Sequence, residues 1–250
     1  MKVTLLQQDI VWGEPSKNVE SAEKAILSNP GSELYVLPEM WTTGFATQPE
    51  GIAETDDSDS LSWMKSMAER TGAAIAGSIA VHCASDGSYR NRFYFVKPDG
   101  DVTYYDKHHL FTYSGEHLRY TAGEEKVIVE WKGIRFRMLV CYDLRFPMWA
   151  RNEENYDVLM YVASWPTPRV EAWRTLLKAR AIENQCYVLG VNRVGTDPAC
   201  QYCGGTAFVD PYGTATQCPD GQTAALTMEI DMESLNEFRG KFPVLKDRDR

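Results

Sequence analysis

Short apolar segments of strand type alternate with amphipathic segments of helix type along most of this chain, and tight turns join several strands directly. Residues 3–8 are expected to form a strand, residues 18–28 a helix with one apolar face, and residues 34–37 a second strand. Strand–helix–strand crossovers favour parallel pairing, whereas the Asp99-Gly100 dipeptide is typical of an antiparallel hairpin. Together, these two features predict a system of mixed sheets and argue against an all-parallel barrel.

The rest of the chain continues this alternation. Further helices are expected over residues 61–70, 146–154 and 171–184. Further strands are expected over residues 73–81, 92–96, 102–105, 127–130, 135–140, 158–162 and 187–193, followed by a hairpin-rich run over residues 206–230 with turns at 211–213 and 220–221. Because so many hairpins need a second sheet or a long edge, we expect an α/β fold in which sheet packs on sheet with helices outside.

Length and charge limit the classes of function. The chain has 250 residues, of which 44% are hydrophobic and 24% charged, so residues 1–250 are expected to form a single domain. The formal net charge of −9 opposes nonspecific binding to nucleic acid or to an anionic membrane. No run of 18 apolar residues occurs and the N-terminus reads as a strand without a signal core, so a cytoplasmic location is expected.

The cysteines do not indicate a disulfide scaffold or a metal site. Six cysteines are scattered along the chain, and only Cys200 and Cys203 are close in sequence. These two lie in a loop, whereas a redox pair opens a helix after a strand. A zinc site would need a second spaced pair, which Cys186 and Cys218 do not supply. We therefore expect no bound metal.

Three polar residues occupy the same topological position, just past the end of an apolar strand. They are Glu39, Lys107 and Cys141. Ligand sites in α/β sheets gather at the carboxyl ends of strands, so these three side chains are candidates for one site. Taken singly, each has an ordinary structural explanation: a small buried thiol, a glutamate ending its strand at the surface, and an edge lysine.

Together the three residues are chemically complementary. Cys141 precedes an expected helix with Pro147 in its first turn, and the positive end of that helix would favour the thiolate. Glu39 could take the thiol proton and return it to a leaving amine. Lys107 and the backbone N–H of Tyr142 could stabilise an oxyanion.

Seven short motifs carry a resemblance to a known family. They are LPEM at residues 37–40, YDKHHLF at 105–111, CYDLRFP at 141–147, ASWP at 163–166, ARAIENQ at 179–185, GVNRVG at 190–195 and GGT at 204–206. Over nearly the whole chain they resemble the nitrilase superfamily of carbon–nitrogen hydrolases. The resemblance implies a four-layer αββα sandwich and an association into homodimers or larger homo-oligomers.

The resemblance also implies roles for individual residues. Glu39 would be the general base, Lys107 the oxyanion-stabilising cation and Cys141 the nucleophile. A second glutamate follows the lysine segment in the family, and Glu116 is the best match. Because residues 121–123 read Thr-Ala-Gly where the family has a Pro-Gly ending, Glu124 remains an alternative.

The motif CYDLRFP looks most like the ω-amidase branch of the superfamily. This implies hydrolysis of the terminal amide of small 2-oxo dicarboxylic acid monoamides, such as 2-oxoglutaramate and 2-oxosuccinamate, through a thioester on Cys141 and without a cofactor. Tyr142, Arg145 and Trp165 are expected to line the substrate pocket. Arg145 is the first candidate for binding a substrate carboxylate, and Arg119 and His109 are further candidates.

Other functions stay open at this point. Within the superfamily they are a nitrilase proper, a carbamoylase or a deaminated-glutathione amidase. His108 and His109 raise the alternative of a Cys–His protease, but both lie beside Lys107 and no orienting group is evident. The alternative outside enzymes is a non-catalytic nitrilase-fold binding module, which would have no reason to retain all of Glu39, Lys107 and Cys141.

Overall fold

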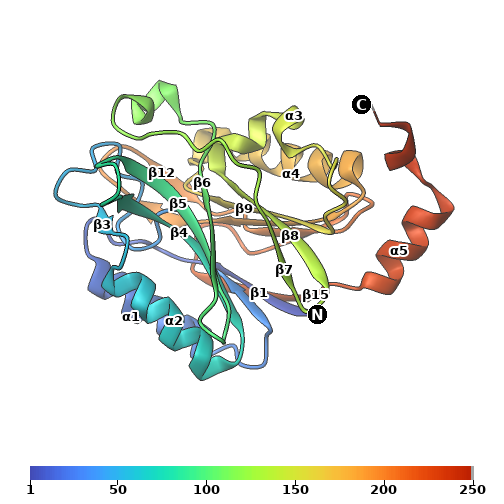
Figure 1. Cartoon of the computed structure of the whole chain (residues 1–250), viewed down its shortest axis with the longest axis horizontal. Helices are drawn as coiled ribbons and strands as arrows, with labels where there is room; N and C mark the ends of the chain where they lie inside the picture. The colour runs from blue at the N-terminus through green and yellow to red at the C-terminus, as the bar shows by residue number, and fades with distance from the viewer. Residues whose placement is uncertain (249–250) are drawn as a thin grey trace.

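Two β-sheets pack face to face and carry helices on their outer faces, as seen in a computed structural model that describes residues 1–248 (Figure 1). The first sheet has seven strands. Its spatial order is β15 (Ala224–Glu229), β1 (Lys2–Gln7), β2 (Leu34–Val36), β4 (Ala74–His82), β5 (Tyr89–Val96) and β6 (Val102–Asp106), with β3 (Glu54–Thr55) beside β4. Strands β1, β2 and β4 are parallel, while β5 and β6 continue the sheet as antiparallel hairpins.

The second sheet has six strands and the same mixed character. Its order is β14 (Ala215–Gln217), β13 (Ala207–Val209), β10 (Tyr187–Asn192), β9 (Val158–Ala163), β8 (Ile134–Val140) and β7 (Ile128–Trp131). Strands β8, β9 and β10 are parallel, and both edges are antiparallel hairpins. A separate two-stranded ribbon is formed by β11 (Val194–Thr196) and β12 (Gln201–Cys203).

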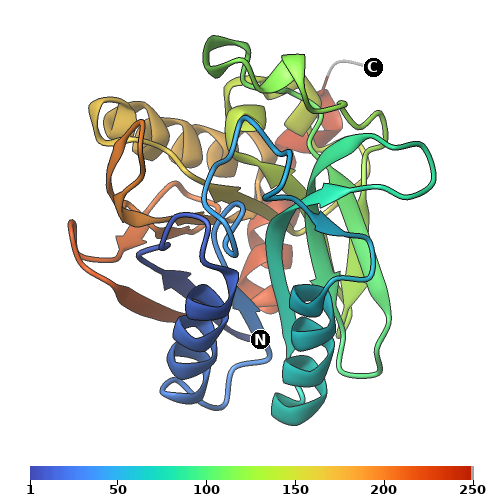
Figure 2. The same cartoon turned by 90° about the vertical axis from the view of Figure 1, so that its left-hand side faces the viewer.

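The helices cover the two outer faces. Helices α1 (Pro15–Leu27) and α2 (Asp59–Thr71) run side by side on the first sheet, and α4 (Val170–Asn184) lies on the opposite side of the molecule (Figure 2). The short α3 (Pro147–Ala150) lies near α4, and α5 (Met232–Lys241) projects at the far end from α1 and α2 (Figure 1). The helices and sheets thus form the expected αββα sandwich.

The alternation of side chains along β5 shows how the layers are held. Phe93 and Phe95 belong to the core between the two sheets, whereas Tyr94 and Val96 belong to the core beneath α1 and α2. Successive strand residues point to opposite faces, so one strand contributes to both apolar cores. Burial on both faces explains why the central strands read as continuous apolar runs.

Two sequence-based expectations are wrong in detail. The helix expected over residues 146–154 is limited to α3, because the buried Asn152 side chain bonds main-chain groups of Tyr156 and Asn184 and draws the chain out of helical geometry. The turn at residues 220–221 does not close a hairpin, since β15 pairs with β1 of the other sheet. Gln7 Nε2 donates to the Pro219 and Gln222 carbonyls, which directs the chain from one sheet to the other.

Within the described residues, no helix is long and apolar enough to cross a membrane.

Candidate active site

Four chemically active side chains meet where strands from both sheets end. Glu39 follows β2, Lys107 follows β6, and Cys141 follows β8 and begins a 3₁₀ turn, η3 (Cys141–Arg145). Glu116 begins another such turn, η2 (Glu116–Leu118). Lys107 Nζ lies 3.0 Å from Glu39 Oε1 and 2.9 Å from Glu116 Oε2, and the three side chains are fully buried. Cys141 lies close enough for Glu39 and Lys107 to influence the pKa of its thiol. The structure thus brings together Glu39, Lys107 and Cys141, the three residues that follow strand ends.

The turn that carries Cys141 has strained backbone geometry. Cys141 has a φ of +45°, a conformation that residues other than glycine rarely adopt. The buried carboxylate of Asp143 holds the turn in place, accepting hydrogen bonds from Val140 N–H at 3.0 Å and Tyr105 Oη at 2.8 Å. Its other oxygen accepts from the His109 main chain at 2.9 Å. Such strain persists only where surrounding contacts enforce it, and it is common at active sites.

The surroundings of the Cys141 sulfur favour the protonated thiol. Desolvation raises its pKa well above the ordinary value, and the Glu39 carboxylate raises it further. The expectation that a helix end favours the thiolate is therefore wrong, because η3 and α3 are too short to act as a long helix. Nucleophilic attack by Cys141 thus requires a base to remove the proton during the reaction.

Lys107 keeps its charge in spite of its burial. Desolvation alone would lower its pKa, but the Glu116 and Glu39 carboxylates raise it above the ordinary value. The pKa of Glu116 is raised by burial and by Glu39, with Lys107 opposing the rise. The cluster therefore places a permanent cation next to the thiol.

Glu116 and Glu124, the two candidates for the second glutamate, lie in different surroundings. Glu116 is buried against Lys107 and accepts a hydrogen bond from Phe111 N–H at 2.6 Å, whereas Glu124 is exposed.

Gly123, just before Glu124, donates its N–H to the Lys107 carbonyl at 3.0 Å. A Cβ at that glycine would lie 2.2 Å from the Asp106 carbonyl oxygen, so only glycine allows this approach.

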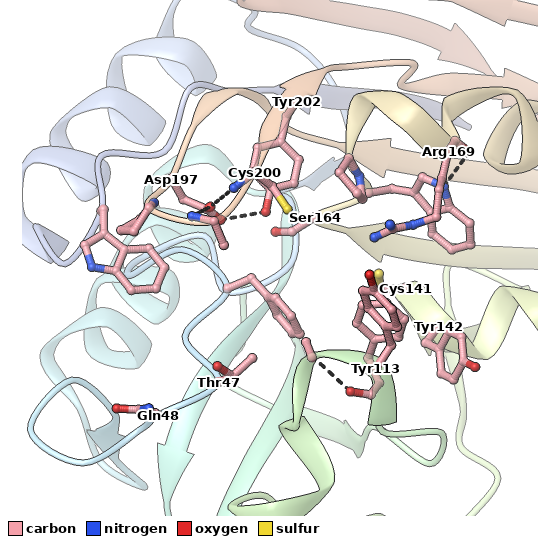
Figure 3. Close-up of a pocket in the computed structure, with 18 of the residues that line it drawn as sticks. Thr47, Gln48, Tyr113, Cys141, Tyr142, Ser164, Arg169, Asp197, Cys200 and Tyr202 are labelled. Carbon is pink, nitrogen blue, oxygen red and sulfur yellow. Dashed lines mark hydrogen bonds between the residues drawn. The ribbon is translucent and has the colours of Figure 1, made fainter.

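Cys141 opens onto a cavity of about 590 Å³ (Figure 3). Tyr142, Arg145 and Trp165 line this cavity. Trp165 is also a buried wall residue, with its Nε1 donating to the Arg169 carbonyl at 2.7 Å. The Arg145 guanidinium lies 5.0 Å from the centre of the Trp165 ring. Further aromatic side chains complete the walls: Trp12, Phe45, Phe111, Tyr113 and Tyr202.

Sequence reasoning missed two polar groups of this site. Arg169 lines the cavity three residues after the ASWP motif, with its guanidinium 5.4 Å from the Phe111 ring centre. Asn91 lies on β5 and donates to Glu39 at 2.8 Å. The sequence could have indicated Asn91, because it is an amide on a strand face that is otherwise occupied by Phe93 and Phe95.

The other candidate residues lie elsewhere or are engaged. Arg119 pairs with Glu50 at 3.2 Å on an exposed surface. His109 Nδ1 lies 2.8 Å from Asp143, and His108 Nδ1 lies 2.6 Å from the Gly123 carbonyl oxygen. The contacts around Cys141 are thus those of a glutamate and lysine cluster, which does not favour a Cys–His protease.

Cys200 and Cys203 both have free thiols, and Cys200 lines the cavity. Among residues 1–248 there is no group of three or more histidine, cysteine, aspartate or glutamate side chains placed to hold a metal ion.

The sequence of the chain is similar to a known family and to named proteins over most of its length. The carbon–nitrogen hydrolase family model matches residues 2–240. An omega-amidase named YafV from Escherichia coli K12 is 46% identical over 251 residues, which cover 100% of this chain and 97% of that protein. A 2-oxoglutaramate amidase from Bacillus subtilis is 37% identical over 98% of this chain and 96% of its own length.

Solved structures agree in fold. A CN-hydrolase superfamily protein from Xanthomonas campestris, solved with an arsenic adduct in its active site, superposes with a TM-score of 0.96 at 39% identity. The match covers 100% of this chain and 97% of that one. A nitrilase superfamily member of branch 10 from Saccharomyces cerevisiae has the same fold, with a TM-score of 0.91 at 23% identity over 100% and 97% of the two chains.

Proposed function

The chain belongs to the carbon–nitrogen hydrolase family, and from this premise we propose that it is an ω-amidase with Cys141 as its nucleophile. Its substrates are small 2-oxo dicarboxylic acid monoamides such as 2-oxoglutaramate and 2-oxosuccinamate, which it converts to the acid and ammonia. Relatives named omega-amidase and 2-oxoglutaramate amidase, at 46% and 37% identity over essentially the full chain, support this assignment.

The observation that carries the proposal is the charge of the cavity beside Cys141. Arg145 and Arg169 both line it, and neither guanidinium takes part in an ion pair within the described residues. Among residues 1–248, Asp197 is the one acidic residue that lines the cavity. It already accepts hydrogen bonds from Tyr202 Oη at 2.6 Å and from the main-chain N–H groups of Ala199 and Cys200. A substrate carrying a carboxylate would complete this cavity, because arginine binds carboxylates through paired hydrogen bonds.

The cluster supports a two-step reaction. The Cys141 sulfur attacks the amide carbonyl carbon while its proton passes to Glu39. When the carbon–nitrogen bond breaks, Glu39 gives this proton to the departing ammonia and a thioester remains on Cys141. A water molecule then attacks the thioester, Glu39 accepts its proton, and cleavage of the carbon–sulfur bond returns the proton to the thiol.

Lys107 and Glu116 support both steps without exchanging protons. Lys107 Nζ and the Tyr142 main-chain N–H stabilise the negative charge that develops on the carbonyl oxygen. Glu116 accepts hydrogen bonds from Lys107 with both oxygens, at 3.0 and 2.9 Å, and so fixes the direction of the ammonium group. The chemistry needs no metal or organic cofactor.

Variants at the two arginines test the proposal. Ammonia release is measured from 2-oxoglutaramate and from an uncharged aliphatic amide, using Arg145→Met, Arg169→Met and the exposed control Arg119→Met. Each cavity variant is expected to lower kcat/KM for 2-oxoglutaramate about tenfold or more, and to leave kcat/KM for the uncharged amide unchanged. Equal losses on both amides, or no loss, would contradict a carboxylate site. If an uncharged amide, a nitrile or a carbamoyl compound then gives a higher kcat/KM than 2-oxoglutaramate, another branch of the family is favoured.

We also propose that the protein acts in the cytoplasm as a homodimer or a larger homo-oligomer. Its six cysteines are all free thiols, as is usual in a reducing compartment. The resemblance to the superfamily supports self-association. Sedimentation equilibrium of the purified chain tests the self-association, and a monomeric mass would contradict it.

A further inference from the structure

Asn91 places a buried amide in the space between the two sheets. It lies on β5, on the same face as Phe93 and Phe95, and is 1% exposed. Burying an amide among apolar side chains costs free energy unless its polar atoms find partners. The partners of Asn91 therefore indicate why an amide stands at this position.

Its partners are the two catalytic-site carboxylates. Asn91 Nδ2 lies 2.8 Å from Glu39 Oε1 and 3.3 Å from Glu116 Oε1. Lys107 Nζ lies 3.0 Å from each of the same two oxygens. Only the NH₂ end of the amide can face two carboxylates, because its oxygen would repel both.

The main chain of Asn91 also positions Lys107. The Lys107 N–H donates to the Asn91 carbonyl at 3.0 Å, which extends the pairing of β5 with β6 by one residue beyond the ladder. One residue thus contacts the main chain of the lysine and the side chains of both glutamates.

The charge balance of the cluster explains the use of an amide. Two carboxylates share one ammonium group, so their mutual repulsion is only partly compensated. The amide adds donors without adding charge, whereas a second lysine or arginine would compete with Lys107 for the oxyanion. Without Asn91, Glu39 Oε1 would keep only its bond to Lys107, while Glu39 Oε2 would still accept from Ser164 N–H at 2.8 Å.

We propose that Asn91 is a positioning residue that aligns Glu39 and Glu116 around Lys107 and so keeps Glu39 able to accept the Cys141 proton. The inference rests on the proposed amidase reaction. Asn91 does not line the cavity, so its effect belongs to proton transfer and not to substrate binding.

The other titratable groups near the cluster do not supply this function. Tyr120 stays neutral, because burial and the nearby Glu116 raise its pKa, and its hydroxyl donates to the Ala46 carbonyl at 2.6 Å. The Cys141 thiol is also neutral at rest. Neither Tyr120 nor Cys141 therefore adds negative charge to the cluster at rest.

Two variants test this role. Asn91→Leu removes the donor at similar volume, and the sterically matched Asn91→Asp adds a third carboxylate, which keeps the test open if leucine is not tolerated. Asn152→Leu is the control, since Asn152 is equally buried but bonds only to Tyr156 and Asn184. The readouts are kcat, KM and kcat/KM for 2-oxoglutaramate from pH 5 to 9, together with the alkylation rate of Cys141 by iodoacetamide over the same range.

The expected result is a fall in kcat of about 10- to 100-fold for Asn91→Leu, with little change in KM. The acid limb of the pH–rate profile should move upward by about one pH unit for Asn91→Leu and further for Asn91→Asp. The alkylation profile should move in the same direction, while the control changes neither profile.

Two results would overturn the inference. One is wild-type kcat and pH dependence in both Asn91 variants. The other is a loss of activity without any displacement of the acid limb, which indicates a structural role like that of Asn152. If the wild-type protein hydrolyses no amide, the proposed function fails, and the alkylation profile still decides the role of Asn91.

Discussion

Replacing Lys107 by methionine should destabilise the protein in a pH-dependent manner. In the wild-type protein Lys107 bonds Glu39 and Glu116 at 2.9–3.0 Å, and all three side chains are fully buried. Removing one partner of a buried ion pair leaves uncompensated charge and costs about 3–5 kcal/mol. For a chain of this size each kcal/mol lowers Tm by about 2–4 °C, so the expected loss at neutral pH is about 6–20 °C.

The pH dependence of this loss follows from the pKa of Glu116. Burial and Glu39 already raise this pKa, and without Lys107 it rises further. A carboxyl whose folded pKa exceeds its unfolded pKa stabilises the fold at low pH, and this contribution is lost as pH rises through the folded value. The wild-type protein keeps the charged Lys107 throughout, because its own pKa is raised. The Tm difference between Lys107→Met and wild type should therefore be small near pH 5 and large at pH 8.

Thermal unfolding followed by circular dichroism from pH 5 to pH 8 measures this difference. The double variant Lys107→Met/Glu116→Gln removes one buried charge and should recover part of the stability at pH 8. An equal loss of Tm at pH 5 and pH 8, without any recovery of Tm in the double variant, would refute the argument from buried charge.

Three further changes have defined outcomes. Glu116→Gln should lower kcat while the exposed control Glu124→Gln leaves it unchanged, as steady-state ammonia assays can show; equal effects would contradict the assignment of the second glutamate. Asp143→Asn should reduce the alkylation rate of Cys141 by loosening its turn, and an unaltered rate would show that the turn does not depend on this carboxylate. Gly190→Ala should destabilise the fold by about 1–3 kcal/mol in urea unfolding, because its Cβ would lie 2.4 Å from Leu177; an unchanged midpoint would mean that α4 can shift freely.

Much of the fold could be predicted because its signals are local. Apolar runs, helical periodicity and the Asp99-Gly100 turn identified most strands, and the mixture of crossovers and hairpins indicated two sheets. The path after residue 217 could not be predicted, since the choice between a hairpin and a change of sheet depends on Gln7, more than 200 residues away in sequence. The early end of α3 likewise depends on contacts of Asn152 with Asn184.

The candidate site was predictable in its residues but not in its electrostatics. Glu39, Lys107 and Cys141 follow strands, and strand ends can be read from sequence. The raised pKa of the Cys141 thiol results from desolvation and from the nearby Glu39 carboxylate, and neither can be inferred from the local sequence around the expected helix. Arg169 was missed because only the fold brings its turn, η4 (Thr167–Arg169), to the wall of the cavity that holds Cys141.

The most direct test of this account is ammonia release from 2-oxoglutaramate by the wild-type protein and by Cys141→Ala. We expect the wild type to release ammonia and 2-oxoglutarate in equal amounts, and the variant, which keeps the fold but lacks the thiol, to release neither. Turnover by Cys141→Ala at the wild-type rate would contradict the thioester mechanism, and no release by the wild type would contradict the ω-amidase assignment.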